Sequence, residues 1–358
     1  MLRITLTVPA DADALGARWR AFEAEAAGSF FQSWTWLGCR FAARFTDPVL
    51  LAAEADGRTL ALALFNRRRG AAGDTLWLGE TGDAAEDAVF TEHNGPLLAA
   101  GAPAGLALAC LKAARGGTLT GLRRFGRRVV LSGIGADLAA AAATLPGTLA
   151  RGPARPAPCV DFASLRAAGQ DHAASLSANS RAQLRRSLRR YGAAGTLAIR
   201  AAADLDEARA FLDALAGLHQ ASWQRRGQPG AFANPAFRAF HQALIARAWP
   251  RGEAELLHVT AGGETIGYLY NFLWRGWALA YQSGFVYPPD DAQRKPGLTC
   301  HHLAIARHLA GGMAGYDFLA GAARYKSSLG NVEHELAWLE LGPAWRPAAL
   351  RQHLTRTA

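Results

Sequence analysis

Two strand–turn–strand signals, one in each half of the chain, restrict most strongly what this sequence can fold into. Residues 48–69 carry two apolar runs on either side of Asp56-Gly57, a favoured two-residue hairpin turn. Residues 255–286 carry three apolar runs, and the first two lie on either side of Gly262-Gly263. A helical pattern precedes each hairpin. This repeated order predicts two related α/β domains.

The length and composition of the chain agree with a two-domain prediction. The 358 residues are long for one domain, and with 50% apolar and 19% charged residues they can form a well-buried core. Residues 148–162 contain three prolines and little periodicity, so we expect a connector there. The predicted domains are therefore residues 1–150 and residues 151–358.

The charge of the chain favours anionic partners. The formal net charge is +10, which suits phosphates, nucleic acid or an acidic membrane surface. One predicted helix concentrates positive charge on its outer faces, at Arg181, Arg185, Arg186, Arg189 and Arg190. A solvated helix face and arginines scattered over the surface are the alternative interpretation.

Several classes of protein are not indicated. The four cysteines, Cys39, Cys110, Cys159 and Cys300, are far apart and lack metal-ligand spacing, so we expect reduced thiols, no bound metal and a cytoplasmic location. No secretory signal is visible, and the uncharged run at residues 95–111 is shorter than the roughly 20 residues of a membrane span. Hydrolase, zinc-protease and P-loop signatures are missing.

Three helices are predicted in the second half. Ser180 and Gln183 fit a capping box, and Leu184, Leu188 and Tyr191 would then face the core. A second helix is expected to open at Asp204 and Glu207 and to run to about His219. The third is expected from Leu298 to about Ala310, where Gly311-Gly312 would end it.

The segment that leads into the third helix has the features of a pyrophosphate site. In "YQSGFVYPPDDAQRKPGLTCHHLAIARH", a strand is followed by a charged loop, a Pro-Gly and a helix start. The first amides of a helix are unpaired, and glycine permits close approach of a ligand. Arg294 and Lys295 add positive charge next to Gly297. An ordinary capped helix would show a similar pattern.

The same segment resembles the acyl-CoA signature of the GCN5-related N-acetyltransferase (GNAT) superfamily, Q/R-x-x-G-x-G/A. Arg294-x-x-Gly297-x-Thr299 matches the first two fixed positions and departs at the third, where threonine is bulkier. The resemblance implies tandem GNAT-like domains, each a mixed, mostly antiparallel sheet flanked by helices. It implies acetyl-CoA, or another acyl-CoA, as co-substrate. The cofactor-binding residues that it implies are Ser283, Gly284, Phe285, Val286, Arg294, Lys295, Gly297, Leu298 and Thr299.

The segment "YDFLAGAARYKSSLG" resembles the part of the superfamily in which a tyrosine protonates the departing CoA thiolate. Tyr325 occupies that position, and a phenol with a pKa near 10 suits a proton donor to a thiolate. From Ala173 to Leu341 the chain is similar to the CelD-like, cellulose-biosynthesis-associated branch and to the Fem-type peptidyltransferases. In the Fem-type relatives a lysine, here Lys326, helps to bind the reacting substrate. Asp317 is a candidate to orient Lys326 or an acceptor amine.

The resemblance thus implies an acyl-CoA-dependent N-acyltransferase that acts on an amine or hydroxyl of a small molecule or saccharide. Trp223, Tyr268 and Gln282 are the candidate acceptor-binding residues, and His301 or His302 could act as a base. The first half lacks an Arg/Gln-x-x-Gly helix start, so it is expected to bind no cofactor. A Fem-like aminoacyl-tRNA-dependent transferase and a non-catalytic module that binds an anionic polymer are the alternatives.

Overall fold

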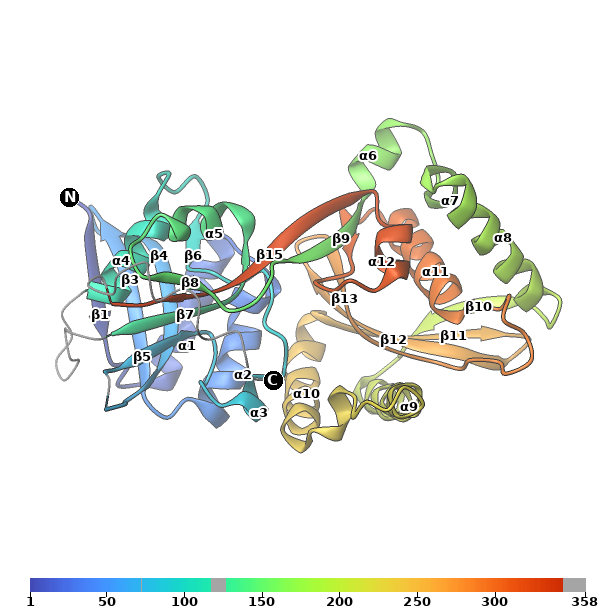
Figure 1. Cartoon of the computed structure of the whole chain (residues 1–358), viewed down its shortest axis with the longest axis horizontal. Helices are drawn as coiled ribbons and strands as arrows, with labels where there is room; N and C mark the ends of the chain where they lie inside the picture. Colours follow the sequence, from blue (N-terminus) through green and yellow to red (C-terminus); the bar gives the residue numbers. More distant parts are fainter. Residues whose placement is uncertain (72, 117–126, 344–358) are drawn as a thin grey trace. The chain divides into compact units, whose positions relative to one another are not determined.

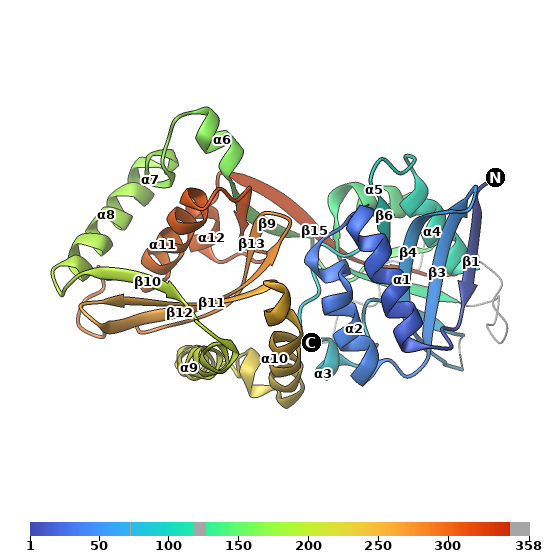
Figure 2. The same cartoon turned by 180° about the vertical axis from the view of Figure 1, so that it is seen from behind.

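The computed structural model describes residues 1–71, 73–116 and 127–343 (Figures 1 and 2). The chain divides into two compact units. Unit 1 comprises Met1–Arg155 together with the chain from Glu335 onward, and unit 2 comprises Pro156–His334. Each unit is a mixed sheet with helices packed on it, so the predicted α/β fold class is confirmed.

Unit 1 contains a sheet with the strand order β1-β3-β4-β5-β7-β15, in which β5 and β7 are parallel and the other neighbours antiparallel. Its strands are β1 (Arg3–Thr7), β2 (Ala26–Ala27), β3 (Pro48–Ala55), β4 (Arg58–Arg68), β5 (Thr75–Leu78), β6 (Leu97–Ala99), β7 (Arg128–Gly135), β8 (Thr148–Ala150) and β15 (Val332–Leu341). Its helices are α1 (Ala12–Glu25), η1 (Phe30–Gln32), α2 (Trp34–Arg44), α3 (Ala84–Asp87), α4 (Leu106–Gly116) and α5 (Ala136–Ala143).

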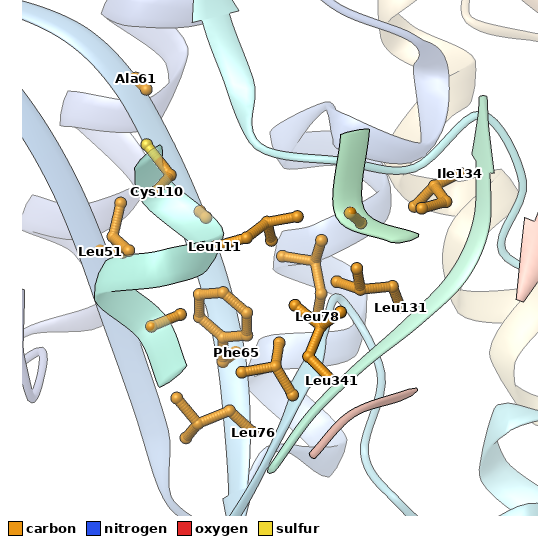
Figure 3. Packing of buried hydrophobic residues seen from close by; sticks show 14 of the residues in the cluster. Leu51, Ala61, Phe65, Leu76, Leu78, Cys110, Leu111, Leu131, Ile134 and Leu341 are labelled. Atoms are coloured by element: carbon orange, nitrogen blue, oxygen red, sulfur yellow. The ribbon is translucent and has the colours of Figure 1, made fainter. Parts of the chain in front are cut away.

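The core of unit 1 lies between its sheet and α4. Figure 3 shows Cys110 and Leu111 of α4 directed at side chains of the strands, among them Phe65 and Leu131. These side chains are at most 1% exposed. An aliphatic side chain buried in this way stabilises the fold by roughly 1.5–3 kcal/mol.

Unit 2 repeats the same arrangement. Its strand order is β9-β14-β13-β12-β11-β10, and only β13 and β14 are parallel. Its strands are β9 (Arg155–Asp161), β10 (Leu197–Ala201), β11 (Ala254–Ala261), β12 (Glu264–Trp274), β13 (Trp277–Phe285) and β14 (Gly315–Asp317). Its helices are α6 (Phe162–Ala167), α7 (His172–Ser175), α8 (Ala178–Gly192), α9 (Leu205–Gln224), η2 (Ala231–Ala233), α10 (Pro235–Ala248), η3 (Trp249–Arg251), α11 (Pro296–Ala310) and α12 (Arg324–Leu329).

The two units share one order of elements. A hairpin is followed by a strand, a helix and a second strand parallel to the first, as β3-β4-β5-α4-β7 in unit 1 and β11-β12-β13-α11-β14 in unit 2. In unit 2, α9 and α10 cover one face of the sheet and α11 the other (Figures 1 and 2). Both predicted hairpins are confirmed: Asp56 and Gly57 have φ of 50° and 76°, and Gly262 and Gly263 have φ of 58° and 88°.

The predicted connector at residues 148–162 contains the boundary between the two units, at Arg155 and Pro156, but it is not irregular, because it forms β8 and β9. Proline lacks an amide proton but keeps its carbonyl. The carbonyl oxygens of Pro156 and Pro158 accept hydrogen bonds from the amides of Gly321 and Phe318, at 2.9 and 3.0 Å. A proline-rich segment can therefore form a strand whose carbonyls bond along one edge.

The predicted helices are present, with corrections at their ends. The capping box at Ser180 is wrong: α8 starts at Ala178, and the Ser177 hydroxyl accepts from the Ser180 amide at 3.2 Å. Leu184 and Tyr191 are buried as predicted. Asp204 caps α9 as predicted, but α9 continues to Gln224, and α11 begins two residues early, at Pro296.

Candidate active site

A gap opens between the parallel strands β13 and β14. The two strands pair only over Trp277–Leu279 and Gly315–Asp317, whereas β13 continues to Phe285. Within β13, Tyr281 is an extra residue between the pairs that β13 forms with β12. Such a bulge bends and twists a strand, so β13 diverges from β14 beyond this point.

Beyond the bulge, no strand in the described part of the chain pairs with the side of β13 that faces away from β12. The Val286 amide donates to Ile266 O of β12 at 2.9 Å, and in an antiparallel pair the direction of these groups alternates. Ser283 and Phe285 therefore direct their backbone groups away from β12, into the gap. We call residues 283–285 of β13 the free edge. Of the four residues predicted to bind a cofactor here, Gly284 and Val286 point their backbone groups the other way, toward β12.

Gly284 serves packing. A Cβ at Gly284 would collide with the backbone of Leu215, so the glycine lets α9 lie close against β13. Ser283 also contacts α9, since its carbonyl accepts a hydrogen bond from His219 Nδ1 at 3.3 Å, while His219 Nε2 accepts from the Ala231 amide at 3.4 Å. His219 thereby joins the end of α9 to the free edge, a contact that the sequence pattern did not indicate.

The start of α11 lies next to the free edge. Pro296 has no amide proton, and the first helical hydrogen bond runs from Thr299 to Lys295 at 3.0 Å. Within the described part of the chain, no acceptor is found for the amides of Gly297 and Leu298. A Cβ at Gly297 would lie 3.4 Å from the Phe285 ring, an ordinary contact distance. Two unpaired amides and the positive end of a helix dipole therefore face the region beside Phe285.

Thr299, the departure from the superfamily pattern, does not obstruct this helix start. Its side chain is fully buried, and its hydroxyl lies 2.8 Å from Ser187 Oγ of α8. Ser187 Oγ also accepts from the Lys295 amide at 2.8 Å. The extra bulk is thus directed at α8, and the Ser187 hydroxyl acts as the cap that Lys295 cannot supply from its own side chain.

Positive charge surrounds the start of α11. Lys295 is exposed, and the Arg294 guanidinium lies 5.4 Å from the centre of the Tyr191 ring and 3.5 Å from a carboxylate oxygen of Asp291. Arg190 of α8 contacts the Gln293 side chain at 3.3 Å. The charges of the loop and of α8 therefore meet at the site predicted for a diphosphate.

Tyr325, the predicted acid, lies on α12 below the gap. Its ring stacks on His301 of α11, with centroids 5.1 Å apart and an interplanar angle of 14°. The side chain is half-buried, and the described residues provide no hydrogen-bond partner for its hydroxyl. Burial, and then the neighbouring Tyr287, raise the pKa of Tyr325 well above its usual value. The phenol therefore keeps its proton throughout the neutral range.

His301 supports Tyr325 and is itself buried. Its Nδ1 lies 2.9 Å from the Tyr316 hydroxyl, and its Nε2 is buried without a partner among the described residues. Burial, and then the charge of Lys326, lower the pKa of His301 to about 3. His301 is therefore a neutral imidazole. His302 packs elsewhere, with its Nδ1 3.0 Å from Nδ1 of His172.

Asp317 and Lys326 meet at the turn that follows β14. Asp317 accepts from the Leu319 amide at 2.6 Å, and Lys326 Nζ donates to the carbonyls of Leu319 and Ala320 at 3.3 and 2.8 Å. Leu319 has a φ of 59°, which costs an ordinary residue roughly 1–2 kcal/mol. The two charged side chains thus hold a strained turn between β14 and α12.

The three predicted acceptor residues are not all brought together. Trp223 is 37% exposed at the end of α9, with its ring 5.8 Å from His219. Gln282 is half-buried on β13. Tyr268 stacks on His258 of β11 with centroids 4.4 Å apart, so a side chain of the neighbouring strand covers one face of its ring.

The corresponding gap in unit 1 is filled by its own chain. β5 and β7 pair over only three residues each, as β13 and β14 do. Beyond them, the Asn94 amide donates to Gly133 O, and the Asn94 side chain donates to Leu78 O, both at 2.9 Å. The Ser132 hydroxyl also donates to Glu80 across the gap, at 2.7 Å. The backbone edge that is open in unit 2 is therefore hydrogen-bonded in unit 1.

The described residues include no group of His, Cys, Asp and Glu side chains that could hold a metal ion. In the same residues, no helix has the length and apolar character needed to cross a bilayer. The four cysteines are buried thiols.

One family model matches part of unit 2. Residues 178–327, which lie within unit 2, match the model of the acetyltransferase (GNAT) domain family. No curated protein matches the chain. The comparisons bear out the GNAT resemblance, and the Fem-type similarity at the level of fold.

Solved structures of low sequence identity share the fold. The crystal structure of FemX is 11% identical, with 92% of this chain and 96% of that chain covered and a TM-score of 0.59. The C-terminal domain of a proposed lysylphosphatidylglycerol synthetase from Agrobacterium fabrum is 12% identical, with 92% of each chain covered and a TM-score of 0.52. A conserved protein of unknown function from Bacteroides thetaiotaomicron is 10% identical, with 95% and 100% covered and a TM-score of 0.52.

Proposed function

We propose that this protein is an acyl-CoA-dependent acyltransferase whose acyl site lies in unit 2. The observation that carries the proposal is the free edge of β13 beside the start of α11, where the amides of Gly297 and Leu298 have no acceptor among the described residues. Amides of an extended pantetheine arm would pair with the backbone of Ser283 and Phe285, as an added strand pairs with a sheet edge. The diphosphate would be held by the amides of Gly297 and Leu298 and by Arg294.

The reaction that fits this arrangement is direct transfer, with an acetyl group as the expected acyl group. An acceptor amine or hydroxyl attacks the thioester carbonyl, and a backbone N–H of β13 that faces the gap stabilises the negative charge on the carbonyl oxygen. The carbon–sulfur bond then breaks, and the sulfur takes the proton of the Tyr325 hydroxyl. The acceptor loses its own proton to solvent, and Tyr325 regains one. Binding of both reactants at one gap supplies proximity.

Asp317 and Lys326 are proposed to act at the same turn. Their hydrogen bonds hold Leu319 and Ala320 in place, and Tyr325 follows five residues later on α12. A correctly placed turn fixes the distance between Tyr325 and the end of β14. Lys326 would also stabilise negative charge near the departing thiolate.

Unit 1 is proposed to bind no acyl-CoA. Its gap is occupied by Asn94, which bonds to both Gly133 and Leu78. The residue Gly133 has a φ of 62°, and a side chain there would collide with the Thr91 carbonyl. An acyl donor could enter only after displacing this segment. The protein should therefore bind one acyl-CoA per chain.

The finer assignments remain part of this proposal. A place in the CelD-like branch and a cytoplasmic location rest on the sequence pattern. An aminoacyl-tRNA-dependent reaction is the second candidate, favoured by four exposed arginines along α8: Arg185, Arg186, Arg189 and Arg190. A module that binds an anionic polymer without catalysis would use the same surface.

Calorimetry with acetyl-CoA tests the proposal. Gly297→Ala should fold normally, because alanine favours a helix and the new methyl group reaches only an ordinary contact with Phe285. The methyl group would narrow the approach to the helix start and weaken binding. Arg294→Ala should raise the Kd by about threefold to tenfold, which corresponds to roughly 0.7–1.4 kcal/mol.

The matched control is Gly217→Ala. Gly217 is exposed in the middle of α9, and no atom lies within 4 Å of a Cβ added there. This variant should bind acetyl-CoA as the parent protein does. No binding of acetyl-CoA by the parent protein, together with steeply salt-dependent RNA binding lost on replacing the α8 arginines, would favour the second candidate instead.

A further inference from the structure

An exposed aromatic surface lies where α9 and β13 end. Trp223, Val286 and Tyr287 are 37%, 39% and 40% exposed, unlike nearly all other large apolar side chains described. The Arg226 guanidinium lies 5.6 Å from the centre of the Trp223 ring, and Arg225 lies 5.8 Å from that of Tyr287. Arg225 and Arg226 are adjacent in the chain, as are Val286 and Tyr287, so these two contacts place the five residues in one patch, which we call the Trp223 surface.

The charge of the Trp223 surface is not neutralised. Both Arg225 and Arg226 are exposed, and within the described residues neither forms an ion pair with a carboxylate. By contrast, Arg200, which lies over the Phe211 ring, pairs with Glu207 at 2.7 Å, and Arg294, which lies over the Tyr191 ring, is 3.5 Å from Asp291. Two unpaired guanidinium groups over aromatic rings attract an anion and leave the ring edges open to an apolar face.

The Trp223 surface is fixed in place. His219, one turn before Trp223, donates to the Ser283 carbonyl, and Gln220 donates to the Pro229 carbonyl at 2.7 Å. The Gln228 amide donates to the Trp223 carbonyl at 3.0 Å. The end of α9 and the loop that follows it are thus tied to the free edge of β13. A surface held in this way loses little conformational entropy when a ligand binds.

The Trp223 surface also lies close to the proposed chemistry. Tyr287 follows the free edge by two residues, and its ring lies 6.3 Å from that of Phe285. Tyr287 is also the residue whose phenol acts electrostatically on Tyr325. A molecule that rests on this surface would therefore sit beside the proposed acid and the gap.

We propose that the Trp223 surface binds the acceptor, and that the acceptor is a sugar bearing an anionic group. This inference rests on the proposed function, because it names the substrate class of the same site. A pyranose ring presents an apolar face, which would lie against the part of the Trp223 indole that Arg226 leaves open. Its phosphate or carboxylate group would lie between Arg225 and Arg226, which donate charge-assisted hydrogen bonds. The amine or hydroxyl of the sugar would then face the thioester.

Ligand-observed NMR without acyl-CoA tests the inference separately from the transfer reaction. The probes are glucosamine and glucosamine 6-phosphate, which differ only in one phosphate, and glucuronate. The anionic sugars should bind at least tenfold more tightly than glucosamine. Trp223→Ala should weaken all three, whereas Arg225→Ala and Arg226→Ala should weaken only the anionic sugars. Arg186→Ala on α8 is the charge-matched control and should change nothing.

Several results would overturn the inference. Equal affinities for glucosamine and glucosamine 6-phosphate would show that the anionic group is not recognised. Unchanged sugar affinity in Trp223→Ala would show that the Trp223 surface is not the binding site. The lack of any sugar binding would also refute it. If the anionic sugars bind as described and acetyl-CoA does not, the inference about this surface stands and the proposed transfer fails. If acetyl-CoA binds and no sugar does, the reverse holds.

Discussion

Ser187 of α8 holds the start of α11, and its replacement by alanine should weaken both the fold and the acyl site. Ser187 Oγ accepts from the Lys295 amide at 2.8 Å and lies 2.8 Å from the Thr299 hydroxyl. Ser187 and Thr299 are both fully buried. A buried hydrogen bond contributes roughly 1 kcal/mol, and a partner left unsatisfied costs about 1–3 kcal/mol. The Thr299 hydroxyl can turn to a carbonyl of its own helix, so we expect Ser187→Ala to lower the free energy of unfolding by about 2–3 kcal/mol.

Urea unfolding measures the first effect, and acetyl-CoA calorimetry the second. Thr299→Val removes only one of the two hydrogen bonds and should lower the free energy of unfolding by about 1 kcal/mol. In Ser187→Ala the Lys295 amide loses its acceptor, so the first turn of α11 should fray. The Kd for acetyl-CoA should then rise about threefold to tenfold, the ratio for roughly 0.7–1.4 kcal/mol.

Ser180→Ala on the same helix is the control. Ser180 lies beside the true cap, Ser177, and far along α8 from Ser187, so this variant should change neither quantity by much. The reasoning would be refuted if Ser187→Ala lowered the free energy of unfolding no more than Ser180→Ala does. It would also be refuted if Ser187→Ala destabilised the protein but bound acetyl-CoA with unchanged affinity.

Three further results are expected. Tyr325→Phe should lower kcat at least tenfold and leave the affinity for acetyl-CoA unchanged, and an unchanged kcat would show that Tyr325 is not the acid. Because the pKa of Tyr325 is raised, its deprotonation should not lower the rate of the parent protein up to pH 9. Acetyl-CoA should titrate to one site per chain in calorimetry, and two equal sites would show that Asn94 does not block unit 1. Burial, and then His172, lower the pKa of His302 to about 4. The unfolded histidine binds a proton below about pH 6.5 and the folded one does not, so stability should fall by up to about 1.4 kcal/mol per pH unit between pH 6.5 and 4. His302→Gln should reduce that slope in urea unfolding, and an identical slope would contradict the assignment.

The strand and helix pattern could be predicted because local chemistry determines it. Asp56-Gly57 and Gly262-Gly263 have the positive φ angles that a two-residue hairpin needs, and few other residue pairs supply them. Asp204 places the start of α9 through a hydrogen bond to the Glu207 amide at 2.8 Å. In each case the residues that decide the conformation lie within four positions of one another.

The errors arise where distant partners decide. Ser177 and Ser180 are equally good caps by residue type, and the choice between them depends on where α8 packs. The segment at residues 148–162 becomes a strand because Phe318 and Gly321, far along the chain, donate to its proline carbonyls. Neither partner is visible from the segment itself.

The residues of the candidate site could be proposed from the sequence, but their geometry could not. Motifs name Arg294, Gly297 and Tyr325 as candidates. Which residues of β13 open toward the gap depends on the bulge at Tyr281, since a shift of one residue reverses every backbone group beyond it. No residue type marks that bulge. The roles of Ser187 and His219 likewise depend on contacts between helices and strands that come together only in the folded chain.

The two gaps differ in two features that the proposed acyl site requires, an open strand edge and a suitable helix start. In unit 1 the gap is closed by Asn94, whose amide donates to the Gly133 carbonyl. This closure needs a glycine at position 133, because a Cβ there would collide with the Thr91 carbonyl. Opening that gap would not by itself create a second site. Helix α4, which precedes β7 as α11 precedes β14, begins at Leu106 without an Arg/Gln-x-x-Gly loop before it. In the proposed function an open strand edge supplies partners for the pantetheine arm and a helix start supplies partners for the diphosphate, and among the described residues only unit 2 has both on adjacent elements.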